Sequence, residues 1–252
     1  MRVLVVADIH ANWQALQAIH EPFDVCVFLG DLVDYGPQPV ECVEWAMANA
    51  THAVRGNHDH GVAQRIVPAN EAGYRSLTAA TRPICWQLLS EEHRGYLARM
   101  PLTRYLRLDG KIILLVHATP RDPLDEYLFN DEANWRRRIE NIEADIVCVG
   151  HTHHQFELQI GSTTILNPGS VGQPRDGDPR AAYAIIENGK ILLRRVKYPI
   201  EETIERMNEL PVSDEVKRLS AAVWRSGGRA SFVPKGEEEA EPALPSDELS
   251  AE

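Results

Sequence analysis

The chain has 252 residues, of which 44% are hydrophobic and 25% are charged, and this composition excludes a wholly disordered or fibrous protein. Its apolar runs fall short of the ~18 residues that a membrane-spanning helix needs, so we expect no membrane partner. The formal net charge is −11, which weighs against duplex nucleic acid as a partner because proteins that bind it carry a basic stripe.

Short apolar runs and capping residues in the first half predict alternating strands and helices. Residues 2–7, 24–29 and 51–54 are typical of buried strands. Asn12 is a suitable N-cap for a first helix, and Pro39 suits the first position of a second helix that ends near residue 49. This order predicts parallel strands joined by right-handed crossovers.

Helices and hairpins are expected in the rest of the chain. Residues 70–100 predict two helices that end before Pro101. Asp109-Gly110 and Asn188-Gly189 predict tight hairpin turns. The further strands are expected at residues 103–108, 111–116, 145–149, 155–160, 163–166, 181–187 and 190–197, and the further helices at residues 131–142, 200–209 and 214–225.

The C-terminal residues from 227 onward differ from the rest of the chain. They are rich in Glu, Ala, Pro and Ser and contain two basic and seven acidic residues. So few apolar side chains cannot offset the entropy cost of ordering the backbone. We therefore expect an acidic, disordered tail.

The cysteines indicate a reducing compartment. Cys26 and Cys148 lie in apolar, strand-like runs, where a thiol acts as a small hydrophobic side chain, and no two of the four cysteines have metal-ligand spacing. The opening apolar run of residues 1–7 is too short for the core of a signal peptide. We therefore expect a cytoplasmic protein.

Residue types that bind metals follow five of the predicted strands. They are Asp8 and His10, Gly30-Asp31, Gly56-Asn57-His58-Asp59, His117, and Gly150-His151-Thr152-His153. Ligands of open α/β sheets bind beyond the carboxyl ends of the strands. Any one of these segments alone is more often a turn or a helix cap, but five such strand ends in order predict a metal site.

These five motifs resemble those of the calcineurin-like metallophosphoesterase superfamily. Residues 31–37, 122–128 and 167–172 are also similar to its small prokaryotic phosphodiesterase branch. The resemblance implies an α/β fold with four layers, αββα, in which two mixed β-sheets are flanked by helices. We expect this domain to span residues 1–198, with helices packed on it at 199–226 and the acidic tail at 227–252.

The resemblance also implies two divalent metal ions and their ligands. One ion would be held by Asp8, His10, Asp31 and His153, and the other by Asp31, Asn57, His117 and His151. Two carboxylates against two divalent ions leave a positive site for a small phosphate ester, and a water between the ions would be the nucleophile. Mixed nitrogen and oxygen ligands suit Mn, Fe, Ni, Co or Zn better than Mg.

Other residues of the motifs are candidates for catalysis and for substrate binding. We expect His58 to protonate the leaving oxygen, and Asp59 to orient the His58 ring and keep it cationic. The candidate substrate contacts are Arg55, Arg121, Arg175 and Tyr35. For the arginines the competing interpretation is a solvated surface side chain, and for the tyrosine it is packing.

The resulting hypothesis is a phosphodiesterase with two metal ions. Protein phosphatases of the superfamily carry Arg at the position of Tyr35 and Glu at the position of Asp59, and both departures weigh against a phosphomonoesterase. A phosphomonoesterase or protein phosphatase, a dinucleoside polyphosphate hydrolase and, more distantly, a non-catalytic scaffold of the same fold remain the alternatives. The sequence leaves the oligomeric state open.

Overall fold

The computed structural model describes residues 1–68 and 73–229. Its elements, in chain order, are β1 (Arg2–Val6), α1 (Trp13–Gln17), β2 (Val25–Phe28), α2 (Pro39–Asn49), β3 (His52–Ala53), α3 (Asn57–Ala63), α4 (Tyr74–Leu88), α5 (Glu91–Arg99), β4 (Thr103–Leu108), β5 (Lys111–Val116), α6 (Glu132–Ile139), β6 (Ile146–Cys148), β7 (Gln155–Ile160), β8 (Thr163–Pro168), β9 (Ala181–Glu187), β10 (Lys190–Val196), α7 (Ile200–Asn208) and α8 (Asp214–Ser226). The short helix α3 is the element that the sequence pattern did not predict.

The strands form two five-stranded sheets, each with parallel and antiparallel neighbours. One sheet has the order β10-β9-β1-β2-β3 and the other has the order β4-β5-β6-β8-β7. The parallel pairing of β1 with β2 and of β2 with β3 confirms the predicted parallel strands. In the second sheet, β6 is parallel to both β5 and β8. Parallel strands have their carboxyl ends on the same side of a sheet, so residues that follow several strands can contribute to one site.

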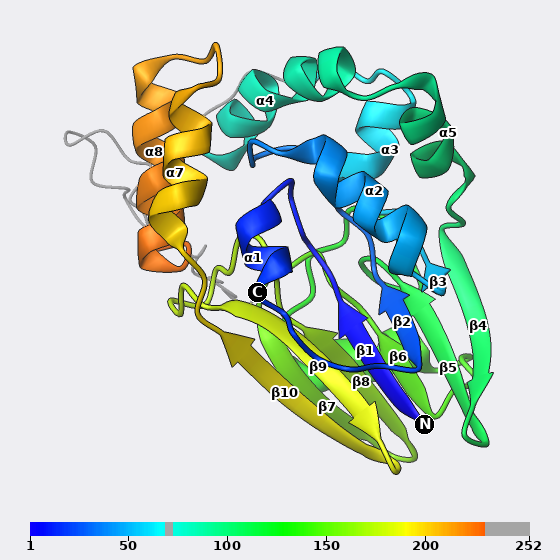
Figure 1. Cartoon of the computed structure of the whole chain (residues 1–252). Helices are drawn as coiled ribbons and strands as arrows, with labels where there is room; N and C mark the ends of the chain where they lie inside the picture. The colour runs from blue at the N-terminus through cyan, green and yellow to red at the C-terminus, as the bar shows by residue number, and fades with distance from the viewer. Residues whose placement is uncertain (69–72, 230–252) are drawn as a thin grey trace, which may run out of the picture.

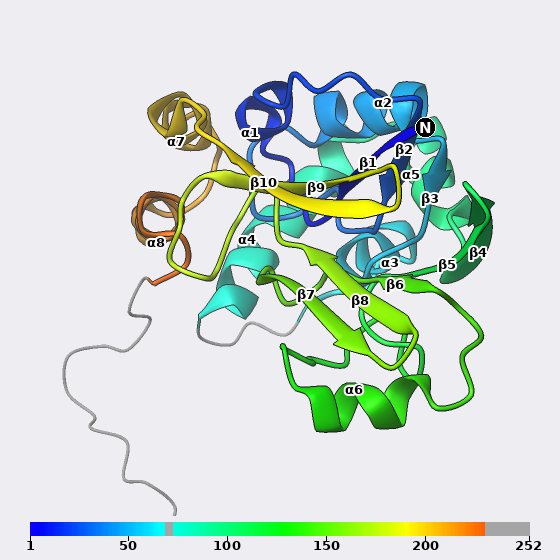
Figure 2. The same cartoon turned by 90° about the horizontal axis from the view of Figure 1, so that it is seen from below.

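Apolar residues on both faces of the strands hold the layers together. Val3 and Val5 of β1 face the second sheet and join a buried cluster with Leu115 of β5. Leu4 and Val6 face the other way, against α1 and α2. Helix α6 covers the outer face of the second sheet, as Figure 2 shows. Burial on both faces explains why these strands read as continuous apolar runs, and the layers confirm the predicted αββα fold.

Helices α7 and α8 lie beside α1 and α4 at one end of the sheets (Figure 1). Trp224 of α8 and Met207 of α7 are buried in a cluster with Leu77 of α4. Gly227 ends α8 in the left-handed conformation, at φ 64°, which suits glycine because it has no Cβ. Residues 227–229 thus belong to the described structure, beyond the predicted start of the tail, whereas residues 230–252 lie outside the described residues.

Candidate metal centre

The structure brings all seven predicted metal ligands together beyond the carboxyl ends of five strands. The set, called the metal cluster below, comprises Asp8, His10, Asp31, Asn57, His117, His151 and His153. All are buried except Asn57, which is half-buried. Within it, donor atoms of Asp8, His10 and His153 gather in one group, and donor atoms of Asp31, His117 and His151 in another. The two groups are candidate metal sites.

The Asp31 carboxylate lies between the two groups. Its Oδ2 is 3.2 Å from Nε2 of His117 and 3.7 Å from Nε2 of His10. Its Oδ1 accepts a hydrogen bond from the backbone N–H of His58 at 2.9 Å. One oxygen of Asp31 is therefore anchored by the backbone, while the other faces a histidine of each group.

Other donor atoms are spaced as ligands of one ion are. Nε2 of His10 is 3.1 Å from Nε2 of His153, which is 3.7 Å from Oδ1 of Asp8. In the other group, Oδ1 of Asn57 is 3.2 Å from Nε2 of His117. Ligands about 2.0–2.2 Å from one ion lie roughly 3–3.5 Å from each other. The spacing therefore fits metal binding.

Backbone carbonyls orient three of the histidine rings. Nδ1 of His10 lies 2.9 Å from the Val33 carbonyl oxygen, and Nδ1 of His117 lies 2.8 Å from that of Leu29. Nδ1 of His153 lies 2.6 Å from the carbonyl oxygen of Gln173. A ring that donates from Nδ1 keeps a lone pair on Nε2, and metal-binding histidines are typically held in this way.

His151 supplies a further indication of a metal site. Its Nε2 is buried and has no hydrogen-bond partner in the described structure, although its backbone N–H donates to the Asp8 carboxylate at 3.1 Å. Buried polar atoms nearly always have a partner, so such an atom calls for an ion or a water. The donor set fits a metal at this point as well.

Burial and neighbouring charges set the protonation of the cluster. Burial lowers the pKa of His151 to about 3 and the pKa values of His10 and His153 well below the usual range. Burial acts the same way on His117, but the Asp31 carboxylate outweighs it and raises the pKa of His117 to about 9. Burial also raises the pKa of Asp8 to about 8. Metal binding therefore competes with protons on His117 and Asp8.

Five residues of the cluster have left-handed backbone conformations. The φ values are 53° for Asp8, 46° for His10, 65° for Asp31, 64° for His151 and 58° for His153. Such conformations cost about 1–3 kcal/mol each for residues other than glycine, and they concentrate at functional sites. These conformations direct the side chains that follow the strands toward the metal cluster.

His58 lies at the edge of the cluster, within reach of His10 and Asp31. Its Nδ1 is 2.7 Å from Oδ2 of Asp34, and that oxygen also accepts hydrogen bonds from Nε and Nη2 of Arg82 at 3.0 and 2.5 Å. Asp34 and Arg82 are both buried. The His58 ring is therefore held by a buried ion pair.

The prediction that Asp59 orients the His58 ring is wrong, because Asp34 does so. The Asp59 carboxylate instead accepts hydrogen bonds from the backbone N–H groups of Asp31, Leu32 and Gly56 at 2.8, 2.8 and 3.1 Å. Asp59 thus joins the loop after β2 to the loop after β3. Both of its oxygens are committed to the backbone, so neither is left for the imidazole.

The sequence offered a signal for Asp34 but none for Arg82. Asp34 stands three residues after Asp31, in the segment that resembles the family, and had been assigned no role. Arg82 comes from α4, 48 residues further along the chain, and reaches Asp34 past Gly61. A Cβ at Gly61 would lie 2.2 Å from Nη1 of Arg82. Such a long-range contact has no local sequence pattern.

A family model for the calcineurin-like phosphoesterase superfamily domain matches residues 1–190. The chain belongs to this superfamily. The phosphodiesterase YfcE of Escherichia coli is 27% identical over 196 residues, which cover 75% of this chain and 88% of YfcE. The uncharacterized protein MJ0912 of Methanocaldococcus jannaschii is 32% identical over 236 residues, which cover 83% of this chain and 93% of MJ0912. The family and the relation to YfcE indicate a hydrolase of phosphate esters.

Solved structures agree with this assignment. A metallophosphoesterase from Sphaerobacter thermophilus is 33% identical, with a TM-score of 0.73, and the match covers 88% of this chain and 99% of that one. The hypothetical protein PH1004 from Pyrococcus horikoshii shares the fold at 21% identity and a TM-score of 0.77, over 91% of this chain and 99% of that one.

Two of the predicted substrate contacts of this phosphoesterase lie beside the metal cluster. The Tyr35 ring is buried, and its centroid is 4.6 Å from that of His10 and 4.8 Å from that of His58. The half-buried Arg175 stacks on Tyr74 and donates from its backbone N–H to the carbonyl of His153. Tyr74 is a neighbour of the site that sequence analysis missed.

The other two predicted contacts are engaged elsewhere. Nη1 of Arg55 donates to the carbonyl of Ala98, in α5, at 3.0 Å. Nη2 of Arg121 lies 2.7 Å from Oε1 of Glu126, and the Arg121 side chain is 65% exposed. Both guanidinium groups are therefore engaged by partners outside the metal cluster of the phosphoesterase domain.

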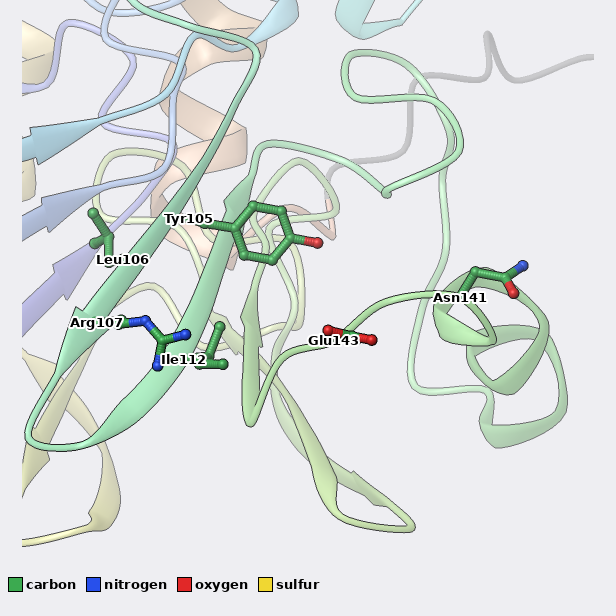
Figure 3. A pocket seen from close by; sticks show the side chains of 6 residues that line it. All are labelled: Tyr105, Leu106, Arg107, Ile112, Asn141 and Glu143. Carbon is green, nitrogen blue, oxygen red and sulfur yellow. The ribbon is translucent and has the colours of Figure 1, made fainter.

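A groove of about 530 Å³ beside β4 and β5 is separate from the metal cluster (Figure 3). It is lined by Tyr105, Leu106, Arg107, Ile112, Asn141 and Glu143. Ile112 is near the start of β5, whereas the cluster residue His117 follows its end. The groove therefore opens at the opposite ends of the strands.

No helix of the described residues has the length and apolar character to cross a membrane.

Proposed function

We propose that this protein is a dinuclear-metal phosphodiesterase that hydrolyses a small phosphodiester. The observation that carries the proposal is the position of Asp31 Oδ2, which faces a histidine nitrogen of each donor group at 3.2 and 3.7 Å. A carboxylate in this place is suited to hold two ions side by side. Asp8, His10 and His153 would complete one site, and Asn57, His117 and His151 the other.

Two divalent ions of the Mn, Fe, Ni, Co or Zn class would supply positive charge and an activated water for the hydrolysis of a phosphate ester. The chain's own part is to fix the donors before binding. Backbone carbonyls hold the rings of His10, His117 and His153, and Asp59 holds the loop that carries Asp31. Donors fixed in this way need little rearrangement when ions bind.

His58 is proposed as the general acid that protonates the leaving oxygen. Its ring lies beside His10 and Asp31 but is held by Asp34 rather than by a backbone carbonyl. A carboxylate on Nδ1 fixes the tautomer and the orientation of the ring. Asp34 is thus proposed as a positioning residue, with Arg82 as its anchor. This assignment replaces the role predicted for Asp59.

A diester is favoured over a monoester by two observations. YfcE, a relative at 27% identity, is named a phosphodiesterase. At the position where protein phosphatases of the superfamily carry a phosphate-binding Arg, this chain carries the buried Tyr35, whose ring packs on His10. We further propose that the enzyme acts in the cytoplasm on a small substrate and not on duplex nucleic acid, since its charge is −11 and its four cysteines are buried and free.

The proposal is tested by metal content and substrate preference together. Metal-free protein is reconstituted with Mn²⁺ or Ni²⁺, the bound metal is counted by elemental analysis, and hydrolysis of bis(p-nitrophenyl) phosphate is compared with that of p-nitrophenyl phosphate. We expect two ions per chain and faster turnover of the diester. In Asp31→Asn both ions and nearly all activity should be lost. Two retained ions in Asp31→Asn would contradict the shared ligand, and a preference for the monoester would contradict the diesterase.

A further inference from the structure

The Arg175 guanidinium lies beside the metal cluster. Nη2 of Arg175 donates to Oε1 of Gln173 at 2.8 Å, while its buried Nε has no hydrogen-bond partner in the part of the chain that the structure describes. Among the described residues, no Asp or Glu forms an ion pair with it. Because desolvating a charge is costly unless it is paired, an anion bound beside Arg175 would complete the site.

Aromatic rings fix this guanidinium in place. Its central carbon lies 3.7 Å from the ring centroid of Tyr74 and 5.6 Å from that of Tyr35, within the range of cation–π attraction. The Tyr35 ring in turn contacts His10. The backbone N–H of Arg175 also donates to the carbonyl of His153, a residue of the cluster. Arg175, Tyr74 and Tyr35 are called the Arg175 subsite below.

We propose that the Arg175 subsite binds a third anionic oxygen of the substrate. The inference rests on the proposed function, in which the metal cluster would bind the reacting phosphodiester. A guanidinium fixed beside that cluster suits a substrate with one more anionic oxygen than a simple diester. Two sources share this chemistry: the third oxygen of a phosphate monoester, and a second phosphate carried by a diester.

The residues that end α8 pack against the Arg175 subsite. The carbonyl of Gly228 accepts a hydrogen bond from the Tyr74 hydroxyl at 3.1 Å, and the carbonyl of Gly227 accepts one from Gly177 N–H at 2.9 Å. A Cβ on Gly228, whose φ is +87°, would lie 2.5 Å from Cα of Arg175. Helices α7 and α8 follow the matched residues 1–190, so residues beyond the matched domain support the Arg175 subsite.

The test compares three esters in the metal-loaded, full-length enzyme. They are p-nitrophenyl phosphate and the p-nitrophenyl ester of thymidine 5′-phosphate with and without a 3′-phosphate. Arg175→Gln should lower kcat/KM roughly 10- to 100-fold for the substrates whose third anionic oxygen the subsite binds, as expected for a lost hydrogen bond to a charged group. It should change that of the simple diester less than about threefold. The responses of the monoester and of the 3′-phosphate show which source is used.

Control variants separate the charge from the fold of the loop. Arg175→Lys keeps the charge and should restore part of the discrimination. Arg180→Gln removes an arginine of the same segment that pairs with Asp178, and should leave all three esters unchanged. An equal effect of Arg175→Gln on all three esters, or no effect on any, would overturn the subsite.

Binding of inorganic phosphate supplies a readout that does not need turnover. By calorimetry, Arg175→Gln should bind phosphate roughly tenfold or more weakly than the parent, at unchanged metal content. Tyr74→Phe keeps the ring but loses the hydrogen bond to Gly228, and should show a smaller loss. Equal phosphate affinity of Arg175→Gln and the parent would overturn the inference. A parent that hydrolyses no ester but shows the affinity difference would contradict the diesterase proposal alone.

Discussion

The metal cluster and the Arg175 subsite are built by different means, although they adjoin. Each donor of the cluster comes from a residue at or just beyond a strand end, and its geometry depends on backbone conformation: left-handed residues such as Asp31 and His153, and ring nitrogens bound to backbone carbonyls. Arg175 instead depends on side chains from distant segments, chiefly Tyr74 of α4, which itself rests on the end of α8.

This difference indicates which parts of the site can be substituted without disturbing the fold. The position of a donor that is held by the backbone depends on the sheets themselves, so the fold sets the geometry of the cluster. A side chain held by other side chains can be altered by single substitutions without disturbing the sheets. His58 combines both, because its backbone N–H binds Asp31 whereas its ring depends on Asp34. Substitutions at His58 should therefore separate chemistry from metal binding.

The largest effect on chemistry alone is expected for His58→Ala. General acid catalysis contributes about 10²–10⁴-fold and matters most for a poor leaving group. We expect kcat to fall by that range for an alkyl or nucleoside diester and much less for bis(p-nitrophenyl) phosphate, with metal content unchanged. The measurement is kcat across a series of leaving groups. An equal loss for every ester would show that His58 positions the phosphate and does not deliver a proton.

A second prediction concerns proton competition in the cluster. The pKa of His117, raised to about 9 because Asp31 outweighs burial, leaves this ring protonated at pH 7 in metal-free protein. A metal must displace that proton, so raising the pH from 7 to 9 should strengthen Mn²⁺ binding roughly tenfold per pH unit. The pKa of Asp8, raised to about 8 by burial, steepens this dependence below pH 8.

The measurement is competition with a chromophoric chelator at pH 6, 7, 8 and 9. As the pH approaches the His117 pKa of about 9, the gain per pH unit should shrink, because fewer proteins carry a proton to displace. Release of protons into weakly buffered solution on metal addition supplies an independent check. Affinity that stays constant from pH 7 to 9 would contradict the proposed protonation of His117.

The sequence predicted the metal cluster better than the surroundings of His58 and Arg175. Metal-binding residue types after apolar strands are local patterns that predict a metal site, and the family resemblance of these motifs implied the ligands from Asp8 to His153 and the αββα layers. The partner of His58 was assigned to its neighbour Asp59, whereas the fold places Asp34 there. Arg82 and Tyr74 were missed because helix α4 approaches the site only through tertiary packing.

A third prediction concerns the buried pair that orients His58. Asp34→Asn leaves Arg82 buried without its carboxylate, which should cost about 3–5 kcal/mol in the free energy of unfolding. We expect kcat to fall roughly 10- to 100-fold, since His58 keeps its place in the chain but loses its partner. The combined variant Asp34→Asn/Arg82→Met should recover much of the stability, because a removed pair is less costly than a broken one. Recovery of activity along with stability would contradict the positioning role.

The smallest effect is expected for Arg121→Gln. The Arg121 side chain is 65% exposed, and its partner Glu126 keeps a second ion pair with Arg138 at 2.6 Å. Exposed ion pairs contribute about 0–1 kcal/mol, so denaturant unfolding should change by no more than that. The kcat/KM for both diesters should stay within about twofold of the parent, because the guanidinium is engaged away from the metal cluster. A tenfold loss of kcat/KM specific to the ester with a 3′-phosphate would mean that Arg121 moves to the substrate when it binds. The anion-binding part of the site would then include the loop after β5 as well as the Arg175 subsite.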